Sequence, residues 1–351
     1  MHLVFSKRPW PIGVEFDGRF VRAAQLSGSP GAWRLSAALH LPRMLPGAEF
    51  DSQEVAQLAG ALGRQGFEGR QIVLAVPEEK MVTGVLELPP RASGAPVDVI
   101  ARAELAAMHD FDPQAAEMAC WDLPASSRQK DVTQAMAVAC RHADAEALLD
   151  VFERGGLDVQ VLDSRLHALV RGCRPVLPPS GMAAVLELAW DRAMLVLLHE
   201  GTVIYKWTMA EAAVGQLAEA LTKNLHVEDD AVEYLLAEVG LTPKAGQAWG
   251  DAASLGAVGA VIRQHLDAIA GAVQSPFVYC AQQYASSVLD HLALVGQGAA
   301  VPGVGEYLQS RLGMNVRTVT PPAVVECPET FGPRAGDPSM IVPIGLAQFP
   351  G

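Results

Sequence analysis

Positive charge is scarce in this sequence. Lysine and arginine total 26 against 39 aspartates and glutamates, so the formal net charge is −13 and the pI is about 5.1. Binding of nucleic acid requires clustered basic residues, and attraction to anionic lipid requires the same. The charge balance therefore argues against nucleic acid as the main partner and against membrane binding by charge alone.

Long hydrophobic runs and metal-binding spacings are also missing. No segment approaches the roughly 18–20 apolar residues of a membrane-spanning helix, and the apolar part of the first ten residues is too short for a signal peptide. We therefore expect a cytoplasmic protein without direct membrane insertion. The five cysteines lie far apart with no CxxC motif, which indicates free thiols in a reducing compartment. The nine histidines follow no HExxH or similar spacing, so we expect no metal site.

The composition is that of a globular protein. Half of the residues are hydrophobic and 19% are charged, which is unlike a disordered chain. A length of 351 residues is enough for two domains, each with its own core.

Residues 12–26 carry the strongest local signal. Two runs of alternating character are separated by Asp17-Gly18, and Asp-Gly at such a place predicts a β-hairpin with a type I′ turn. Glu15 then lies at the end of the first strand. The elements expected next are a strand, a helix capped by Asp51 and a buried strand, at 33–39, 51–66 and 71–76.

Residues 78–143 predict a small α/β unit. The pattern indicates a strand ending in Leu-Pro-Pro, a helix, and two strands joined by the polar span 125–131. These elements are expected at 81–88, 97–109, 116–123 and 133–140. A helix at 143–155 should end at Gly155-Gly156, and Asp163 is predicted to cap the next helix.

The second half repeats the order of the first, since three strands are again followed by helices. The predicted strands are 182–189, 193–199, 202–207, 292–298 and 316–318, and the predicted helices are 210–221, 229–239, 255–270, 275–289 and 302–312. Residues 339–348 are expected to close the second domain. The predicted domains are 1–178, which includes the small α/β unit at 78–143, and 179–351, which includes a helical subdomain at 210–289.

Several segments resemble one family, in that family's order. They are IGVEFDGRFVRAAQL at 12–26, GGLDVQVLD at 155–163 and LALVGQGAAVPGVGEYLQSRLGMNV at 292–316. The matching hairpin residues are Ile12, Gly13, Val14, Glu15, Val21, Arg22, Ala23, Ala24, Gln25 and Leu26. The family is that of the PilM-type assembly proteins of type IV pili, relatives of the cell-division protein FtsA in the actin and sugar-kinase superfamily.

The small α/β unit at 78–143 resembles a subdomain that is inserted at this place in the pilus proteins, so the resemblance is to the pilus branch of the superfamily. Glu87-Leu88-Pro89 and Trp121-Asp122-Leu123 stand where these proteins carry similar residues, whereas ordinary sugar kinases lack the insertion. The resemblance implies an α/β fold of the actin-like (ribonuclease H-like) type, with two duplicated domains around a cleft and a small subdomain inserted in the first.

The resemblance also implies where a nucleotide would bind. The residues at the family's two phosphate loops, its adenosine helix and its nucleoside loop are Glu15, Asp17, Gly18, Glu187, Glu233, Gly296 and Gly298. Asp17 replaces a glycine, Trp190 and Asp191 stand in the second loop, and Leu236 replaces a lysine.

The acids at the phosphate loops argue against nucleotide chemistry. Glu15, Asp17, Glu187 and Asp191 would repel phosphate unless a metal intervened. We therefore expect a degenerate site without catalytic residues, ATP hydrolysis or a bound cofactor. ATP with Mg²⁺ is the alternative.

The function that the resemblance implies is a non-enzymatic scaffold at the inner-membrane platform of a type IV pilus or a related secretion machine. Its expected partner is the short cytoplasmic tail of a PilN-like single-pass membrane protein, captured as a peptide in a groove, beside other platform and motor components. The groove is expected between the inserted subdomain and the first domain, near 81–123 and 158–172. Such a protein would be cytoplasmic and held at the inner membrane through its partners.

Two other functions are compatible with the same fold. One is an active ATPase or small-molecule kinase in which Glu15 and Glu187 replace the usual aspartates. The other is the cytoplasmic domain of a GspL-type protein of type II secretion, for which we expect a membrane-spanning helix after the fold.

Overall fold

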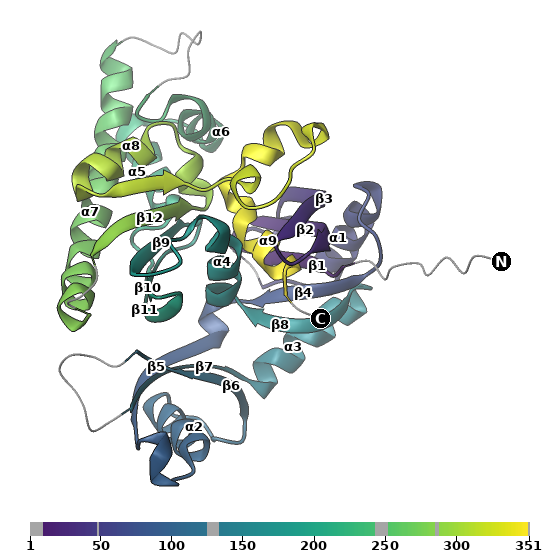
Figure 1. The fold of residues 1–351 in the computed structure, drawn as a ribbon. Coiled ribbons are helices and arrows are strands. Elements are labelled where there is room, and N and C mark those ends of the chain that lie inside the picture. The colour runs from purple at the N-terminus through teal and green to yellow at the C-terminus, as the bar shows by residue number, and fades with distance from the viewer. Residues whose placement is uncertain (1–9, 48, 125–132, 243–251, 285–287, 350–351) are drawn as a thin grey trace.

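The computed structural model describes residues 10–47, 49–124, 133–242, 252–284 and 288–349 (Figure 1). The polar span predicted at 125–131 lies outside the described residues. Two five-stranded sheets and one three-stranded sheet form the β-structure of the described chain. In both larger sheets, three antiparallel strands are followed by two parallel ones, so the predicted duplication is confirmed.

The first sheet has the order β3-β2-β1-β4-β8. Its strands are β1 (Ile12–Phe16), β2 (Phe20–Ser29), β3 (Ala32–Pro42), β4 (Gln71–Val76) and β8 (Asp158–Ser164). Helices α1 (Ser52–Arg64) and α3 (His142–Arg154) cover one face, and α4 (Arg165–Cys173) and α9 (Ile341–Ala347) cover the other. Because side chains alternate along a strand, Ile12 and Val14 face α1. Gly13 faces α9, where any Cβ would collide with the backbone oxygen of Pro343.

The hairpin at 12–26 is confirmed, but its predicted turn type is wrong. A type I′ turn needs positive φ at both central residues, and neither Gly18 nor Arg19 has a positive φ. Instead, Oδ1 of Asp17 accepts hydrogen bonds from the backbone N–H groups of Arg19 and Phe20, both at 2.8 Å. The aspartate side chain therefore shapes the turn, as in an Asx turn.

The helix caps of the first lobe agree only in part with the prediction. Asp51 caps α1 by accepting from the Glu54 N–H at 2.8 Å, as predicted. The cap of α4 is Ser164, whose Oγ accepts from the His167 N–H at 3.2 Å. Asp163 is therefore not the cap. Its carboxylate forms an ion pair with Arg171.

The inserted unit has the predicted elements. They are β5 (Met81–Leu88), α2 (Val97–Met108), β6 (Ala116–Asp122) and β7 (Thr133–Arg141), in the sheet order β5-β7-β6. Helix α2 covers one face of this sheet and encloses a separate small core with it. The unit lies at the bottom of Figure 1.

The second sheet has the order β11-β10-β9-β12-β13. Its strands are β9 (Met182–Leu188), β10 (Ala193–His199), β11 (Thr202–Met209), β12 (Leu289–Val295) and β13 (Asn315–Thr318). The main helices packed on its outer face are α5 (Val214–Leu225), α6 (Asp229–Tyr234), α7 (Ala252–Gln283) and α8 (Val304–Leu312). Among the helices of the described chain, none combines the length and the apolar character that a membrane crossing requires.

The prediction of two separate helices at 255–270 and 275–289 is wrong, because α7 spans most of this region. It is one helix of 32 residues with Pro276 inside, and β12 already begins at Leu289. Proline removes one backbone hydrogen bond and usually breaks a helix. Here Val273 and Cys280, on either side of Pro276, are both buried in the same core, and this packing holds both halves in line.

The C-terminal segment belongs to the first lobe by its packing. Residues 339–348 were expected to close the second domain, but α9 packs against β1, β2 and α4. The crossing with α4 is close, because a Cβ on Gly345 would collide with the backbone of Ala168. The chain thus returns from the second sheet to the first before it ends (Figure 1).

Asp337 ties this C-terminal segment to the first sheet, and it predicts a dependence of stability on pH. Its Oδ2 lies 2.8 Å from Nδ1 of His40 on β3, and its Oδ1 accepts from Ser339 Oγ at 2.7 Å. Burial alone would raise the pKa of Asp337, but the bonds from His40 and Ser339 outweigh it and lower the pKa to about 2.

A carboxylate whose folded pKa is lowered adds stability that is complete above its ordinary pKa of 3.8 and is lost as the pH falls toward 2. We expect Asp337→Asn to lower the free energy of unfolding at pH 7 by about 2 kcal/mol. Urea unfolding at a series of pH values measures this, and the difference from the parent should shrink below pH 4. An equal difference at pH 3 and pH 7 would contradict the prediction.

Candidate functional site

Glu15 and Glu187 occupy corresponding places in the two duplicated sheets. Glu15 lies near the end of β1, and Glu187 lies near the end of β9. Each of these strands pairs with an antiparallel neighbour on one side and a parallel neighbour on the other. Both side chains are buried, with 0% and 1% exposure. Two buried carboxylates need compensating charge nearby.

Arg165 supplies that charge from the first residue of α4. Its Nη1 contacts Glu15 Oε2, its Nη2 lies 2.7 Å from Glu187 Oε1, and its Nε lies 2.9 Å from Glu187 Oε2. Burial alone would lower the pKa of Arg165, but the two glutamates outweigh it and raise the pKa well above its ordinary value. Because Glu187 comes from the second sheet, this guanidinium joins the two lobes in their interior.

A second buried arginine completes the cluster. Nη1 of Arg22 lies 2.9 Å from Glu15 Oε1 and 2.9 Å from Asp17 Oδ2. Burial would raise the pKa of Asp17, but Arg22 and the backbone N–H groups of the turn lower it. Two arginines therefore offset two of the three carboxylate charges at the predicted acidic end of the cleft. We call Glu15, Asp17, Arg22, Arg165 and Glu187 the buried ion cluster.

The carboxylate oxygens of the buried ion cluster are already bonded, which argues against binding of a metal–triphosphate group. A metal held through water would need free carboxylate oxygens, and in this arrangement both oxygens of Glu15 and both of Glu187 are bonded to guanidinium groups. No group of three or more acidic, histidine or cysteine side chains among the described residues is arranged to hold a metal ion. The residues present at this position therefore do not fit Mg²⁺ with a triphosphate.

Arg19 of the first lobe contacts the turn at Trp190 and helix α6, where the sequence predicts the second phosphate loop and the adenosine helix. The guanidinium of Arg19 lies 4.3 Å from the ring centroid of Trp190 and pairs with Glu233 on α6. Glu233 thus belongs to a contact across the mouth of the cleft. Leu236, which stands where a lysine was expected, is 8% exposed and lies in the core of the second lobe.

The glycines of the predicted nucleoside loop allow the loop to pack closely against Leu188. Gly296 has φ +85°, and a Cβ there would lie 2.6 Å from the backbone oxygen of Leu188. A Cβ on Gly298 would lie 2.7 Å from Cβ of Leu188. The loop therefore rests on the end of β9, beside Glu187 in the chain.

A cavity remains beside the buried ion cluster, on the side of the second lobe. Its volume is about 650 Å³. The residues that line it include Gly18, Arg19, Trp190, Asp191, Gly215, Glu219 and Lys223. Among the sequence-predicted residues, the structure brings Glu15, Asp17 and Glu187 into one cluster, places Gly18 and Asp191 beside it, and keeps Glu233 at the rim.

A groove lies between the inserted unit and the first lobe, in the region where the sequence predicts one. It has a volume of about 340 Å³ and is bordered by β6, β7, α3 and the β8–α4 junction. Its apolar lining includes Val76, Met81, Met118, Val138 and Leu162, and its polar lining includes Glu117, His142, Asp163 and His167. Strand β8 is an edge strand of the first sheet, and β6 is an edge strand of the inserted sheet.

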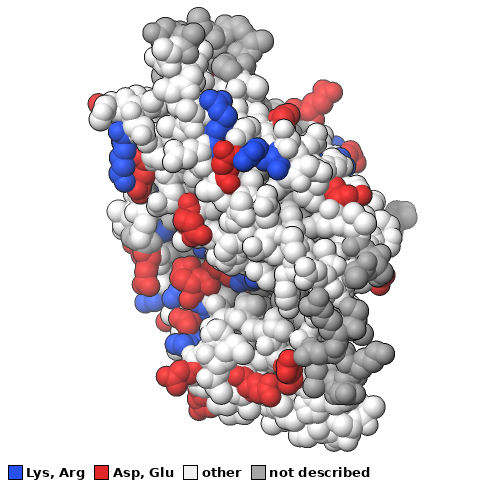
Figure 2. Space-filling view, turned by 90° about the vertical axis from the view of Figure 1, so that its left-hand side faces the viewer, with Lys and Arg blue, Asp and Glu red and all other residues white. Residues whose placement is uncertain are grey.

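The charged surface is mixed on the face drawn in Figure 2. Basic side chains stand among acidic ones along the left of this face, and a broad area on the right carries few charges. The basic side chains form no continuous patch on this face.

Comparison with known proteins identifies the family. The family described as "Type IV pilus assembly protein PilM" matches residues 13–347. The chain belongs to the PilM family of type IV pilus assembly proteins. No curated protein matches the chain.

Solved structures agree on the fold. A structure described as a PilM–PilN type IV pilus biogenesis complex is 19% identical over 97% of this chain and 98% of that chain, with a TM-score of 0.75. The ethanolamine utilization protein EutJ from Carboxydothermus hydrogenoformans is 14% identical over 98% and 91%, with a TM-score of 0.57. MreB5 of Spiroplasma citri bound to ADP is 10% identical over 95% and 94%, with a TM-score of 0.51. At these identities the matches show the actin-like fold, which confirms the predicted fold class.

Sequence reasoning missed the two arginines of this PilM-family cleft. Arg22 could have been found from the hairpin register, because a two-residue loop after Asp17 places Arg22 opposite Glu15. No local signal marks Arg165, which lies 150 residues from Glu15 in the chain.

Proposed function

We propose that this protein is a non-enzymatic scaffold of a type IV pilus machine on the cytoplasmic side of the inner membrane. It binds the short cytoplasmic tail of a PilN-like membrane protein and presents that tail to the other platform and motor components. Membership of the PilM family supports the pilus assignment.

The single observation that carries the non-enzymatic part is the buried ion cluster. Arg165 occupies the space between the two carboxylates that would organise metal-bound water in an ATPase. Displacing it would leave Glu187 buried without its Arg165 contacts and Glu15 paired with Arg22 alone, at a cost of several kcal/mol. Binding of ATP would have to offset that cost, so both affinity and turnover should be low.

The groove beside the inserted unit supports the peptide-binding part. One solved structure of similar fold is described as a PilM–PilN complex. In this chain the groove runs between two sheets whose edge strands, β6 and β8, border it. An extended peptide fits such a place because its backbone can bond to a strand edge while its apolar side chains enter the groove.

Calorimetric titration with ATP and Mg²⁺, together with a phosphate-release assay, tests the non-enzymatic part. We expect no binding up to about 1 mM, which corresponds to a free energy weaker than about −4 kcal/mol, and no phosphate release. Micromolar affinity with turnover that falls on Glu187→Gln would overturn the proposal in favour of an ATPase. A labelled PilN-like tail peptide, titrated with the same protein sample, tests the partner separately.

A further inference from the structure

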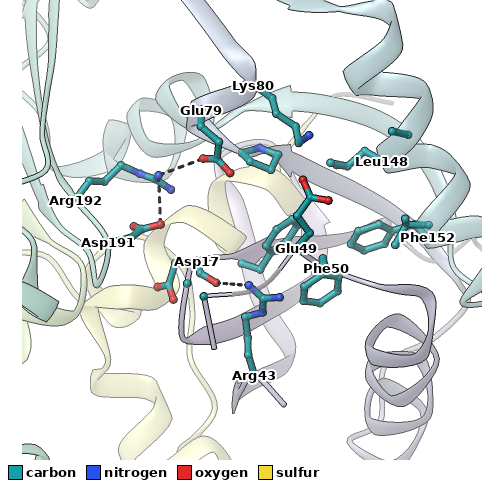
Figure 3. Close-up of a pocket in the computed structure, with 16 residues that line it drawn as sticks. Asp17, Arg43, Glu49, Phe50, Glu79, Lys80, Leu148, Phe152, Asp191 and Arg192 are labelled. Atoms are coloured by element: carbon teal, nitrogen blue, oxygen red, sulfur yellow. Dashed lines mark hydrogen bonds and ion pairs between the residues drawn. The ribbon is translucent and has the colours of Figure 1, made fainter. Parts of the chain in front are cut away.

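A second cavity of the cleft lies on the side of the first lobe. Its volume is about 550 Å³, within the range of small-molecule sites. It is enclosed by the end of β1, the loop before α1, the 3₁₀ turn Glu78–Lys80, α3 and the turn at Asp191-Arg192 (Figure 3).

The floor of this cavity is an aromatic stack. Phe16 and Phe50 have ring centroids 4.5 Å apart, and Phe50 and Phe152 have centroids 5.6 Å apart with an angle of 10° between the rings. Leu148 and Val151 of α3 continue the apolar wall. Such a floor suits a flat apolar body, because offset stacking adds to the burial of apolar area.

The opposite wall holds a buried guanidinium with spare donors. Arg192 is 8% exposed, and its Nε has no hydrogen-bond partner among the described residues. Its carboxylate contacts are long, at 3.3 Å to Asp191 and 3.8 Å to Glu79, and the Glu79 side chain is 70% exposed. Nε itself is enclosed by the protein, so a ligand in the cavity would meet the Nη end of the guanidinium.

Lys80 adds a second cation at the same wall. Its Nζ lies 3.4 Å from Asp144, and its side chain is 26% exposed. Figure 3 shows Lys80 and Glu79 on the side of the cavity opposite Phe50. The two cations therefore face the aromatic floor across the cavity.

The other charges at the cavity are largely committed elsewhere. Arg43 is bonded to both oxygens of Glu54, at 3.2 and 3.0 Å, and Asp17 is paired with Arg22. Glu49 is exposed, and its carboxylate points from the side of Phe50 toward Lys80 (Figure 3). Asp191 also lines the cavity; its Oδ1 is buried without a hydrogen-bond partner in the described part of the chain, and burial raises the pKa of Asp191. The cations that keep only long contacts at this cavity are Arg192 and Lys80.

We propose that this cavity binds a small amphipathic carboxylate, whose planar apolar body lies on Phe16 and Phe50 and whose carboxylate bonds to Arg192 and Lys80. The site is separate from the groove and borders the buried ion cluster at Asp17, and it does not depend on the proposed scaffold function. A ligand there contacts both lobes, because Arg192 lies in the turn between β9 and β10 of the second lobe and the aromatic floor belongs to the first lobe.

The test uses the full chain and three probes with one indole ring. Indole-3-propionate carries the carboxylate, indole-3-propionamide is neutral and tryptamine is cationic. Titration by calorimetry and by saturation-transfer NMR should give a dissociation constant of about 1 mM or lower for the carboxylate, and at least about tenfold weaker binding of the other two probes. Equal binding of the three probes, preference for tryptamine, or no binding of the carboxylate at about 5 mM would overturn the proposal.

Single substitutions assign the site. Arg192→Gln and Phe50→Ala should each weaken binding of indole-3-propionate about tenfold. Lys80 lies near the surface, so Lys80→Gln should weaken binding of indole-3-propionate about threefold without affecting the fold. Glu49→Gln removes a like charge and should strengthen binding about two- to threefold.

The direction of each change in affinity shows whether the bound ligand is anionic. If Arg192→Gln proves unstable, Lys80→Gln and Glu49→Gln still give opposite changes only for an anionic ligand in this cavity. Unchanged affinity in both surface variants would overturn the proposal.

Discussion

Arg165→Leu should lower the free energy of unfolding by about 3–5 kcal/mol, because it leaves two buried carboxylates without their shared partner. Glu15 would retain Arg22, but Glu187 would lose every ion-pair contact that Arg165 makes with it. The two lobes would also lose their interior charged link. Urea unfolding followed by circular dichroism measures the change at pH 7.5.

The control for Arg165→Leu is the double variant Arg165→Leu/Glu187→Leu. Replacing both partners of a buried ion pair by apolar groups is often close to neutral, so the double variant should recover most of the lost stability. Arg154→Leu removes an exposed ion pair with Asp150 and should change the free energy of unfolding by less than about 0.5 kcal/mol. A loss below about 1 kcal/mol for Arg165→Leu would show that the buried ion cluster contributes no more than a surface pair.

Ala119→Arg should weaken binding of a PilN-like tail peptide at least about 100-fold, since a long charged side chain would fill the apolar groove and leave a charge to be desolvated. Ala119 lies on β6, is exposed in the free protein and lines the groove. The substitution should therefore leave the fold intact. Fluorescence anisotropy of a labelled peptide measures the affinity, and thermal unfolding checks the fold.

The matched control for the groove is Ala107→Arg. Ala107 is exposed on α2, on the other side of the inserted sheet, so the same substitution there should leave peptide affinity unchanged. Equal affinity of Ala119→Arg and the parent would place the tail elsewhere. Equal losses in both variants would indicate a general effect of added charge.

The sequence alone determined most of the secondary structure and the duplicated order of the sheets. Strands such as β1, β4 and β9, the cap at Asp51 and the whole inserted unit follow from periodicity and capping chemistry, which depend on neighbours in the chain. The family and the fold class were also accessible, because short motifs occur in a recognisable order. The position of the groove followed from the resemblance.

Tertiary structure decided what depends on contacts between distant segments. The Asp17 side chain replaced the expected type I′ turn, core packing carried α7 past Pro276, and α9 returned to the first sheet. The sequence predicts an acidic end of the cleft from Glu15, Asp17, Glu187 and Asp191, but in the fold Arg165 pairs with both Glu15 and Glu187 and offsets part of that charge. The hydrophobic periodicity of a segment indicates which of its residues are buried. It does not indicate which opposite charge lies beside a buried charge, because that depends on which distant segment the fold brings there. For that reason the sequence located the two glutamates, and only the fold showed that an arginine joins them.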